Sequence, residues 1–400
     1  MFLVDDSPLA LVLLKRILAT SPAIEVVGTA RNGREALAAF ERTRPDVICT
    51  DYQMPEMDGL ELIKHTMATF PRPILVISSI IDPGQREQVF PLLAAGAVDV
   101  VAKPSAIDSL EQSAILLVQK IKLLSGVVVI SRRLSTSENS ASVRVAYSPG
   151  AAPRTGSARE SASPPPLATR APQNIETKRS GAPPASGHSQ PVSKPEINGA
   201  PVALRPYQAN PVRLVAIGAS TGGPQALQTL LSRLPPNISC PILCVQHIST
   251  GFLQGLVEWL NNTCPIRVKI ADDGEQALAG TVYFPPEDRH LEIDHRGQIT
   301  LSHAPPLGGH RPAVCVTFHA VARAYGNNAV AVLLTGMGSD GASGMESVIL
   351  AGGATLAQDE ASCIVFGMPK QAILRGAAHF VMSPEKIAEK IARMAGSNPE

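Results

Sequence analysis

Aromatic residues are scarce in this chain of 400 residues. Phenylalanine, tyrosine and tryptophan make up 4% of it, with a single tryptophan. Basic and acidic residues are nearly equal in number, 35 against 34, which gives a net charge of +1. This balance argues against the basic surface that nucleic-acid binding requires. No uninterrupted apolar run is long enough to cross a bilayer, so we expect no membrane insertion.

Cysteine is present only six times and without metal-binding spacing. No CxxC pair occurs, and most of the cysteines lie inside apolar runs, as free thiols of cytoplasmic proteins do. They are Cys49, Cys240, Cys244, Cys264, Cys315 and Cys363. Residues 1–6 hold no basic segment and reach two aspartates at once, unlike a signal peptide. We therefore predict a cytoplasmic protein, and its length indicates two or three domains.

Residues 1–124 alternate between short apolar runs and amphipathic helical patterns. Five such pairs predict a doubly wound parallel sheet of the flavodoxin-like kind. The expected strands lie at 1–4, 24–30, 46–50, 74–78 and 97–102, and the expected helices at 9–20, 33–43, 59–70, 85–95 and 109–124.

Polar residues follow the expected strands of this first sheet. They are Asp5 and Asp6 after the first strand, Asp51 after the third, Ser78 at the end of the fourth and Lys103 after the fifth. Three carboxylates at one sheet edge repel one another unless a cation joins them, and oxygen ligands suit Mg²⁺. A lysine and a hydroxyl facing the same point suit a phosphoryl group. Any one of these residues alone is better explained as a loop or capping residue.

The motifs Val4-Asp-Asp-Ser7, Thr50-Asp-Tyr-Gln-Met-Pro55 and Ala102-Lys-Pro104 resemble a response regulator receiver domain. The resemblance covers residues 1–124. It implies that Asp51 accepts a phosphoryl group from a histidine kinase and that Asp5 and Asp6 hold Mg²⁺ with it. It also implies that Ser78 and Lys103 contact the phosphoryl oxygens.

Composition changes over residues 125–210, where serine, proline, alanine and glycine dominate and aromatics almost vanish. Such a segment cannot bury enough apolar surface to fold, so we predict a disordered linker. Residues 211–395 return to α/β alternation and predict a second doubly wound sheet of the Rossmann-like kind. Its expected strands lie at 214–217, 241–246, 267–270, 281–284, 329–334 and 354–357, with a hairpin at 291–301.

Ser220 lies on the turn between the first strand and the first helix of this second sheet. Gly218-Ala-Ser-Thr-Gly222 matches the nucleophile elbow of serine hydrolases, loosely resembles a dinucleotide-binding glycine loop, and also fits a purely structural turn. The second strand ends on His247, where a dinucleotide site needs an acid. Asp340 follows a late strand. A nucleophile, base and orienting acid thus follow three strands of one sheet, in an order that differs from the α/β-hydrolases.

The motifs Gly218-Ala-Ser-Thr-Gly-Gly223, Val245-Gln-His247, Leu334-Thr-Gly-Met-Gly-Ser-Asp-Gly341 and Phe366-Gly-Met-Pro369 resemble the catalytic domain of the CheB chemotaxis methylesterases. The resemblance implies hydrolysis of glutamate γ-methyl esters on methylated chemoreceptors, and deamidation of glutamines. Ser220 is then the nucleophile, His247 the base and Asp340 its orienter, with Thr221 and Met337 stabilising the transition state. No cofactor serves the esterase step, and a CheA-type histidine kinase is the phosphodonor.

The residues leave two alternatives open. The chain could be a receptor-binding scaffold without turnover, which would have no need to retain Ser220, His247 and Asp340. It could also hydrolyse a small-molecule ester, for which a deep apolar pocket is needed. Among the other histidines, we favour a structural role for His290 and His310, although both could shape the crevice.

Overall fold

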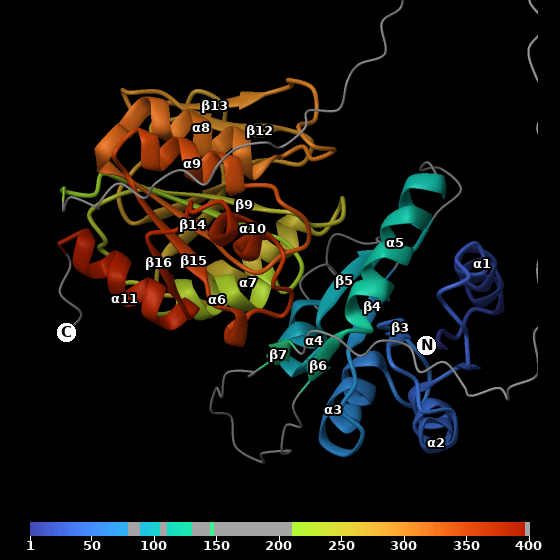
Figure 1. Ribbon diagram of the computed structural model, residues 1–400. Helices are drawn as coiled ribbons and strands as arrows, with labels where there is room; N and C mark the ends of the chain where they lie inside the picture. The colour runs from blue at the N-terminus through green and yellow to red at the C-terminus, as the bar shows by residue number, and fades with distance from the viewer. Residues whose placement is uncertain (79–88, 105–109, 130–144, 148–209, 397–400) are drawn as a thin grey trace, which may run out of the picture. The chain divides into compact units, whose positions relative to one another are not determined.

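The computed structural model describes residues 1–78, 89–104, 110–129, 145–147 and 210–396. They form two parallel sheets with helices on both faces, which confirms the predicted fold class (Figure 1). Most of the predicted linker lies outside these residues. Within the described part of the chain, no helix combines the length and apolar character needed to span a membrane.

The N-terminal sheet has the flavodoxin-like strand order β2-β1-β3-β4-β5, with every pair parallel. Its strands are β1 (Phe2–Val4), β2 (Gly28–Ala30), β3 (Ile48–Thr50), β4 (Ile74–Ser78) and β5 (Asp99–Ala102). Its helices are α1 (Pro8–Leu18), α2 (Gly33–Thr43), α3 (Gly59–Thr69), α4 (Phe90–Ala95) and α5 (Leu110–Leu124). The second strand is much shorter than predicted.

Alternation along β1 builds a core on each face of this sheet, because successive side chains of a strand point to opposite sides. Phe2 and Val4 join the core that includes Phe40 of α2, whereas Leu3 joins the core that includes Leu14 of α1. With both faces covered by helices, the loops at the strand ends are the exposed edge.

The C-terminal sheet has seven parallel strands in the order β10-β11-β9-β8-β14-β15-β16. They are β8 (Leu214–Ala219), β9 (Ile242–Gln246), β10 (Arg267–Ile270), β11 (Thr281–Phe284), β14 (Ala329–Leu333), β15 (Ala354–Gln358) and β16 (Phe380–Met382). A separate antiparallel hairpin joins β12 (His290–Ile293) and β13 (Ile299–Ser302). Sequence analysis missed β16, whose short half-exposed segment carries no strong apolar pattern.

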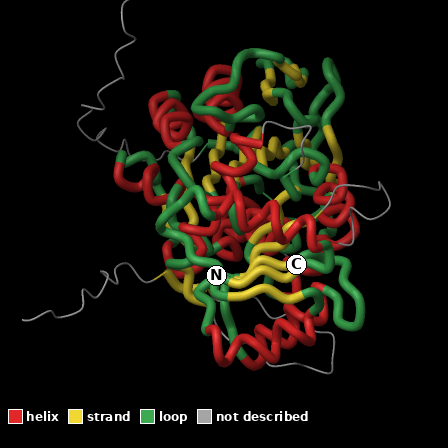
Figure 2. The backbone as a smooth tube through the Cα atoms, turned by 90° about the vertical axis from the view of Figure 1, so that its right-hand side faces the viewer, coloured by secondary structure: helices red, strands yellow, loops and turns green. Residues whose placement is uncertain are grey.

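Helices cover both faces of the C-terminal sheet. They are α6 (Gly223–Leu231), α7 (Leu253–Thr263), α8 (Val314–Tyr325), α9 (Ala342–Leu350), α10 (Met368–Leu374) and α11 (Pro384–Met394). Figure 1 shows α8, α9 and the hairpin on one side of the sheet, and α6, α7 and α11 on the other. Figure 2 shows the strands of the chain in yellow among the red helices that flank them. Leu214 and Ala216 pack toward the first group, and Val215 and Ile217 toward the second.

A second small antiparallel pair joins β6 (Val127–Val129) and β7 (Val145–Tyr147). Both strands fall within the stretch 125–210 that was predicted to be a linker. This pairing was missed because three-residue runs separated by a polar stretch give no periodic signal.

Candidate functional site

The strand order of the C-terminal sheet reverses where β8 and β14 are neighbours. The chain leaves β8 toward β9 on one side and later returns to β14 on the other. Doubly wound sheets bind ligands at such a reversal, beyond the carboxyl ends of the strands. Ser220 directly follows β8, His247 directly follows β9, and Asp340 lies in the loop between β14 and α9. The three predicted residues therefore lie at the same edge.

Ser220 occupies a tight turn between β8 and α6. Its N–H donates to the carbonyl oxygen of Thr335 at 3.0 Å, and its own carbonyl accepts from the N–H of Gly223 at 2.7 Å. Pro224 lies in the first turn of α6, where its missing N–H costs little. The loop after β14 passes close by, since a Cβ on Gly336 would lie 2.7 Å from the Ser220 Cβ. Only glycine allows this approach.

Two predicted oxyanion donors flank this turn. Within the described part of the chain, the N–H groups of Thr221 and Met337 donate no hydrogen bond. Thr221 is buried, and its carbonyl accepts from the Thr335 hydroxyl at 3.0 Å. Free N–H groups beside a nucleophile are what an oxyanion needs.

His247 and Asp340 lie against each other. The Nε2 of His247 is 2.9 Å from the Oδ2 of Asp340, and both side chains are about nine-tenths buried, at 11% and 7% exposed. The two atoms lie within ion-pair distance but lack the alignment of a hydrogen bond, and they carry opposite charges only when His247 is protonated. Asp340 is held from its other side by the N–H groups of Val314 and Cys315 at the start of α8, at 2.7 and 2.9 Å.

These contacts set the charge of Asp340. Burial alone raises the pKa of its carboxyl, but His247 and the N–H groups of Cys315 and Val314 outweigh burial and hold the pKa well below its usual range. The start of α8 adds a favourable partial positive charge. Asp340 is therefore ionised at neutral pH and able to orient the ring of His247.

Cys315 lies at the start of α8, beside Asp340. Its sulfur accepts the N–H of Gly341 at 3.0 Å and lies 3.1 Å from the Ser343 hydroxyl. Burial, and then the charge of Asp340, raise the pKa of the thiol. Cys315 therefore adds no second negative charge beside Asp340.

His310 has a closer relation to the site than we predicted. Its ring stacks on that of His247, with ring centroids 4.0 Å apart and an angle of 7° between the planes. No sequence pattern signals this contact, because the two residues lie in different loops. His290 has the expected structural role: it is buried, accepts from the N–H of Ala313 and contacts the Pro305 carbonyl.

This stack predicts a pH dependence of stability. Burial lowers the pKa of His310, and His247 lowers it further, while Asp340 acts in the opposite sense. Below about pH 6.5, the value of an unfolded histidine, the unfolded chain binds more protons than the folded one. Neutral His310 therefore contributes its full share to the free energy of unfolding above that pH. This contribution is lost as the pH falls toward the pKa of His310 in the folded protein. Between about pH 5.5 and about pH 7.5, a range around that value, the melting temperature should shift less in His310→Phe than in the wild type. An equal shift in both proteins would contradict this origin.

The predicted phosphoacceptor cluster is also assembled at the edge of the N-terminal sheet. The Nζ of Lys103 lies 2.7 Å from the Oδ2 of Asp5 and 2.6 Å from the Oδ2 of Asp51. Ser78 adjoins Lys103, whose N–H donates to the Ser78 carbonyl at 2.9 Å. Carboxylate oxygens of Asp5, Asp6 and Asp51 all lie within 4.8 Å of one another. Three hard oxygen donors at this spacing fit Mg²⁺.

In this cluster, burial and charge pairing act in opposite directions on the pKa of Asp51 and on that of Lys103. Burial raises the pKa of the Asp51 carboxyl, and Lys103 only partly offsets it. Burial lowers the pKa of Lys103, but its bonds to Asp5 and Asp51 outweigh this and raise it above its usual value. Lys103 is therefore protonated at neutral pH and can pair with an anion bound in the cluster.

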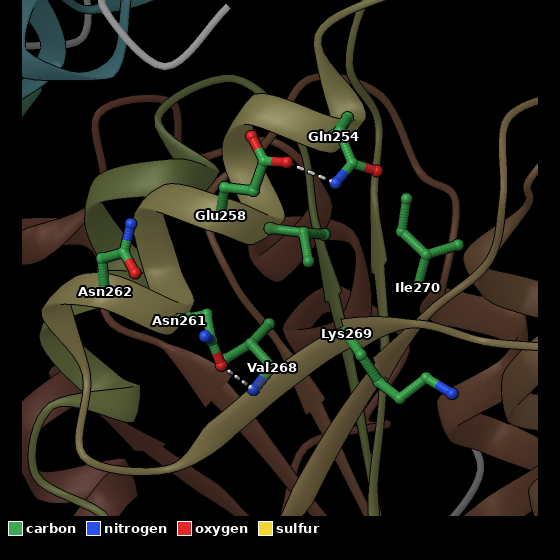
Figure 3. Close-up of a pocket in the computed structure, with 8 residues that line it drawn as sticks. Gln254, Glu258, Asn261, Asn262, Val268, Lys269 and Ile270 are labelled. Atoms are coloured by element: carbon green, nitrogen blue, oxygen red, sulfur yellow. Dashed lines mark hydrogen bonds between the residues drawn. The ribbon is translucent and has the colours of Figure 1, made fainter.

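A separate pocket of about 400 Å³ lies beside the edge strand β10 (Figure 3). Three of its polar side chains already pair with nearby groups: Gln254 donates to Glu258 at 2.6 Å, and Asn261 accepts the N–H of Val268 at 2.9 Å. None of the predicted site residues lines it. Its lining residues are Gln254, Val257, Glu258, Asn261, Asn262, Val268, Lys269 and Ile270.

Both sheets have counterparts among known proteins. Residues 215–391 match the CheB methylesterase family, and residues 1–115 match the response regulator receiver domain. The chain is 37% identical to a protein-glutamate methylesterase/protein-glutamine glutaminase of Nitrosospira multiformis, over 99% of this chain and 97% of that protein. A similarly named protein of Syntrophus aciditrophicus is 38% identical, over 99% and 98%.

Among solved structures, the CheB methylesterase catalytic domain of Thermotoga maritima is 40% identical, covering 46% of this chain and 98% of that one, with a TM-score of 0.45. The identity to full-length relatives spans nearly the whole of both chains. This chain therefore belongs to the CheB methylesterase family and carries a response regulator receiver domain.

Proposed function

We propose that this protein hydrolyses glutamate γ-methyl esters on methylated chemoreceptors, with Ser220 as the nucleophile. The observation that carries the proposal is the buried contact between His247 and Asp340 at the sheet edge where Ser220 emerges. The relatives, which are named as protein-glutamate methylesterases, support the substrate class. We place the receiver at residues 1–124, the linker at 125–210 and the catalytic domain at 211–395.

The proposed reaction proceeds through an acyl-enzyme. The Oγ of Ser220 attacks the ester carbonyl while His247 accepts the hydroxyl proton, and Asp340 holds the resulting imidazolium. The N–H groups of Thr221 and Met337 stabilise the oxyanion. His247 then gives its proton to the leaving methanol. Water then attacks the acyl-enzyme while His247 accepts its proton. The bond to the Oγ of Ser220 breaks, His247 returns the proton to that oxygen, and the glutamate carboxylate is released.

Deamidation of receptor glutamines uses the same steps with another leaving group. Ser220 attacks the amide carbonyl, His247 protonates the departing ammonia, and water again releases glutamate. The relatives named as glutaminases support this second activity. Because an amine leaves less readily than an alcohol, protonation by His247 matters more in this reaction.

We further propose that a CheA-type histidine kinase phosphorylates Asp51. Lys103 and the hydroxyl of Ser78 contact the phosphoryl oxygens, and Asp5, Asp6 and Asp51 hold Mg²⁺. When bound, the ion neutralises negative charge that the phosphoryl group brings to the acidic cluster. Phosphorylation raises esterase activity by shifting the population toward an active arrangement.

Phosphorylation of Asp51 should depend on Mg²⁺ through Asp6. This exposed acid is free of the Lys103 contacts that hold Asp5 and Asp51. With acetyl phosphate as donor, labelling of Asp51 should disappear in EDTA, and Asp6→Asn should require at least about tenfold more Mg²⁺, the least expected when a carboxylate that serves a metal site is lost. Asp46→Asn, at an exposed acid outside the cluster, is the control. Equal Mg²⁺ requirements for Asp6→Asn and the control would contradict the ligand role.

The proposed activity is tested by methanol release from membranes that carry radiolabelled methylated receptors. The full chain should release methanol, and release should rise when a small-molecule phosphodonor is added. A scaffold without turnover would bind the membranes and release none. An esterase for small molecules would cleave a soluble ester but leave the receptor methylated.

A further inference from the structure

Gln246, the last residue of β9, lies between the two halves of the proposed catalytic site. Its side chain is 4% exposed. The amide Nε2 donates to the carbonyl oxygen of Ser220 at 2.8 Å and to that of His247 at 2.8 Å. One side-chain amide thus joins the backbones of the proposed nucleophile and base. We propose that Gln246 is a positioning residue that fixes the separation of Ser220 and His247, an inference that rests on the proposed function.

The position of this amide in the sheet explains why the site needs it. The last backbone hydrogen bond between β8 and β9 runs from the N–H of His247 to the carbonyl of Ala219, at 2.9 Å. Beyond it, β8 turns into the Ser220 elbow and the ladder ends. The Gln246 side chain extends the link between the two segments by one more step. Without it, the backbone hydrogen bond between His247 and Ala219 is the last link between the two segments, and the Ser220 carbonyl loses its bond to β9.

The amide oxygen of Gln246 is also consistent with the positioning role. The Oε1 of Gln246 is buried and has no hydrogen-bond partner in the described part of the chain. The two carbonyl acceptors fix the orientation, because the flipped amide would place Oε1 against both of them. Oε1 instead lies at the start of α6, where the helix dipole favours a partial negative charge.

Gly223 makes room for this oxygen. A Cβ on Gly223 would lie 1.9 Å from the Oε1 of Gln246 and 2.9 Å from the Cβ of Ala219. The first residue of α6 therefore has to be glycine for the amide to reach both carbonyls. Gly223 also donates its N–H to the Ser220 carbonyl, so this oxygen is held from two directions.

Other buried polar side chains that the structure describes near the site bond to Thr221 and to neighbouring strands, but not to both Ser220 and His247. The Thr335 hydroxyl donates to the carbonyls of Thr221 and Val365, and Gln358 accepts the N–H of Thr335. These bonds hold the elbow against β14 and β15. Within the described residues, only Gln246 has a side chain that bonds to both Ser220 and His247.

The test compares variants of the full chain in methanol release and in labelling of Ser220 by a fluorophosphonate. Gln246→Met keeps the length of the side chain and removes both donors, and Gln246→Glu places a carboxylate against two carbonyl oxygens. Each should lower kcat by about 10- to 100-fold with KM within about twofold, because a misplaced nucleophile slows chemistry without touching substrate binding. Labelling should slow in the same proportion.

Gly223→Ala provides an independent route to the same defect. Its Cβ should displace the amide and lower kcat, although alanine itself favours the helix. Combined with Gln246→Met, the loss should be smaller than the product of the two separate losses, since both variants break one connection. The matched control is Thr355→Val on β15, which removes a buried hydroxyl that bonds to His379 and to none of the catalytic residues.

Gln246→Met with full kcat and full labelling, beside an active wild type, overturns the positioning role alone. Loss of activity matched by Thr355→Val in proportion to lost thermal stability also overturns it. A wild type that releases no methanol and whose Ser220 is not labelled overturns the proposed function and this inference together.

Discussion

Ser220→Ala should lower methanol release from methylated receptors by ~10⁴-fold or more, while the protein still binds the receptor membranes. The change removes only the hydroxyl, and the turn that carries it is held by backbone hydrogen bonds to Thr335 and Gly223. The fold should therefore survive, and the loss should appear in kcat. Release is measured as volatile radiolabel from receptor-containing membranes.

The other members of the site rank in a defined order. His247→Ala should cost as much as Ser220→Ala, because a nucleophile without its base is as ineffective as a base without its nucleophile. Asp340→Asn should cost less, since the asparagine oxygen still accepts one of the two N–H groups at the start of α8 and the ring of His310 still stacks on His247. Ser302→Ala, in the hairpin strand β13, is the serine control. Normal release by the Ser220 variant would refute the assignment.

Asp51→Asn should abolish the response of the esterase to a phosphodonor and leave basal activity in place. Asparagine keeps the size of the side chain but cannot accept a phosphoryl group. It also removes one of the two anions that hold Lys103, whose Nζ still contacts Asp5 at 2.7 Å. The ratio of methanol release with and without acetyl phosphate should fall to about one. Without a phosphoryl group on residue 51, nothing favours the active arrangement over the inactive one.

Two outcomes would speak against this regulatory role. If Asp51→Asn still responds to acetyl phosphate, the phosphoryl group acts at another residue. If wild type and variant have equal activity under all conditions, the receiver does not control the esterase. Asp46→Asn, which leaves the cluster intact, should respond as the wild type does.

The amino-acid sequence by itself determined the two-sheet fold and the membership of nearly all of both candidate sites. Buried parallel strands are nearly continuous apolar runs, so Ile74–Ser78 and Thr281–Phe284 were predicted with their observed bounds. Residues that follow such strands meet at one sheet edge whatever the details of packing. For that reason the strand pattern alone assigns Ser220, His247, Asp340 and the cluster around Asp51 to crevices.

Tertiary structure alone decided how these residues are held. The stacking of His310 on His247, the two N–H groups that bind Asp340, and the amide of Gln246 between two carbonyls all join segments distant in the sequence. The short strands β6, β7 and β16 were likewise not predicted, because a run of three residues is too short to show a hydrophobic periodicity. Strand patterns are local and survive in a linear string, whereas ring stacking and side-chain hydrogen bonds depend on which loops face each other once the core has packed.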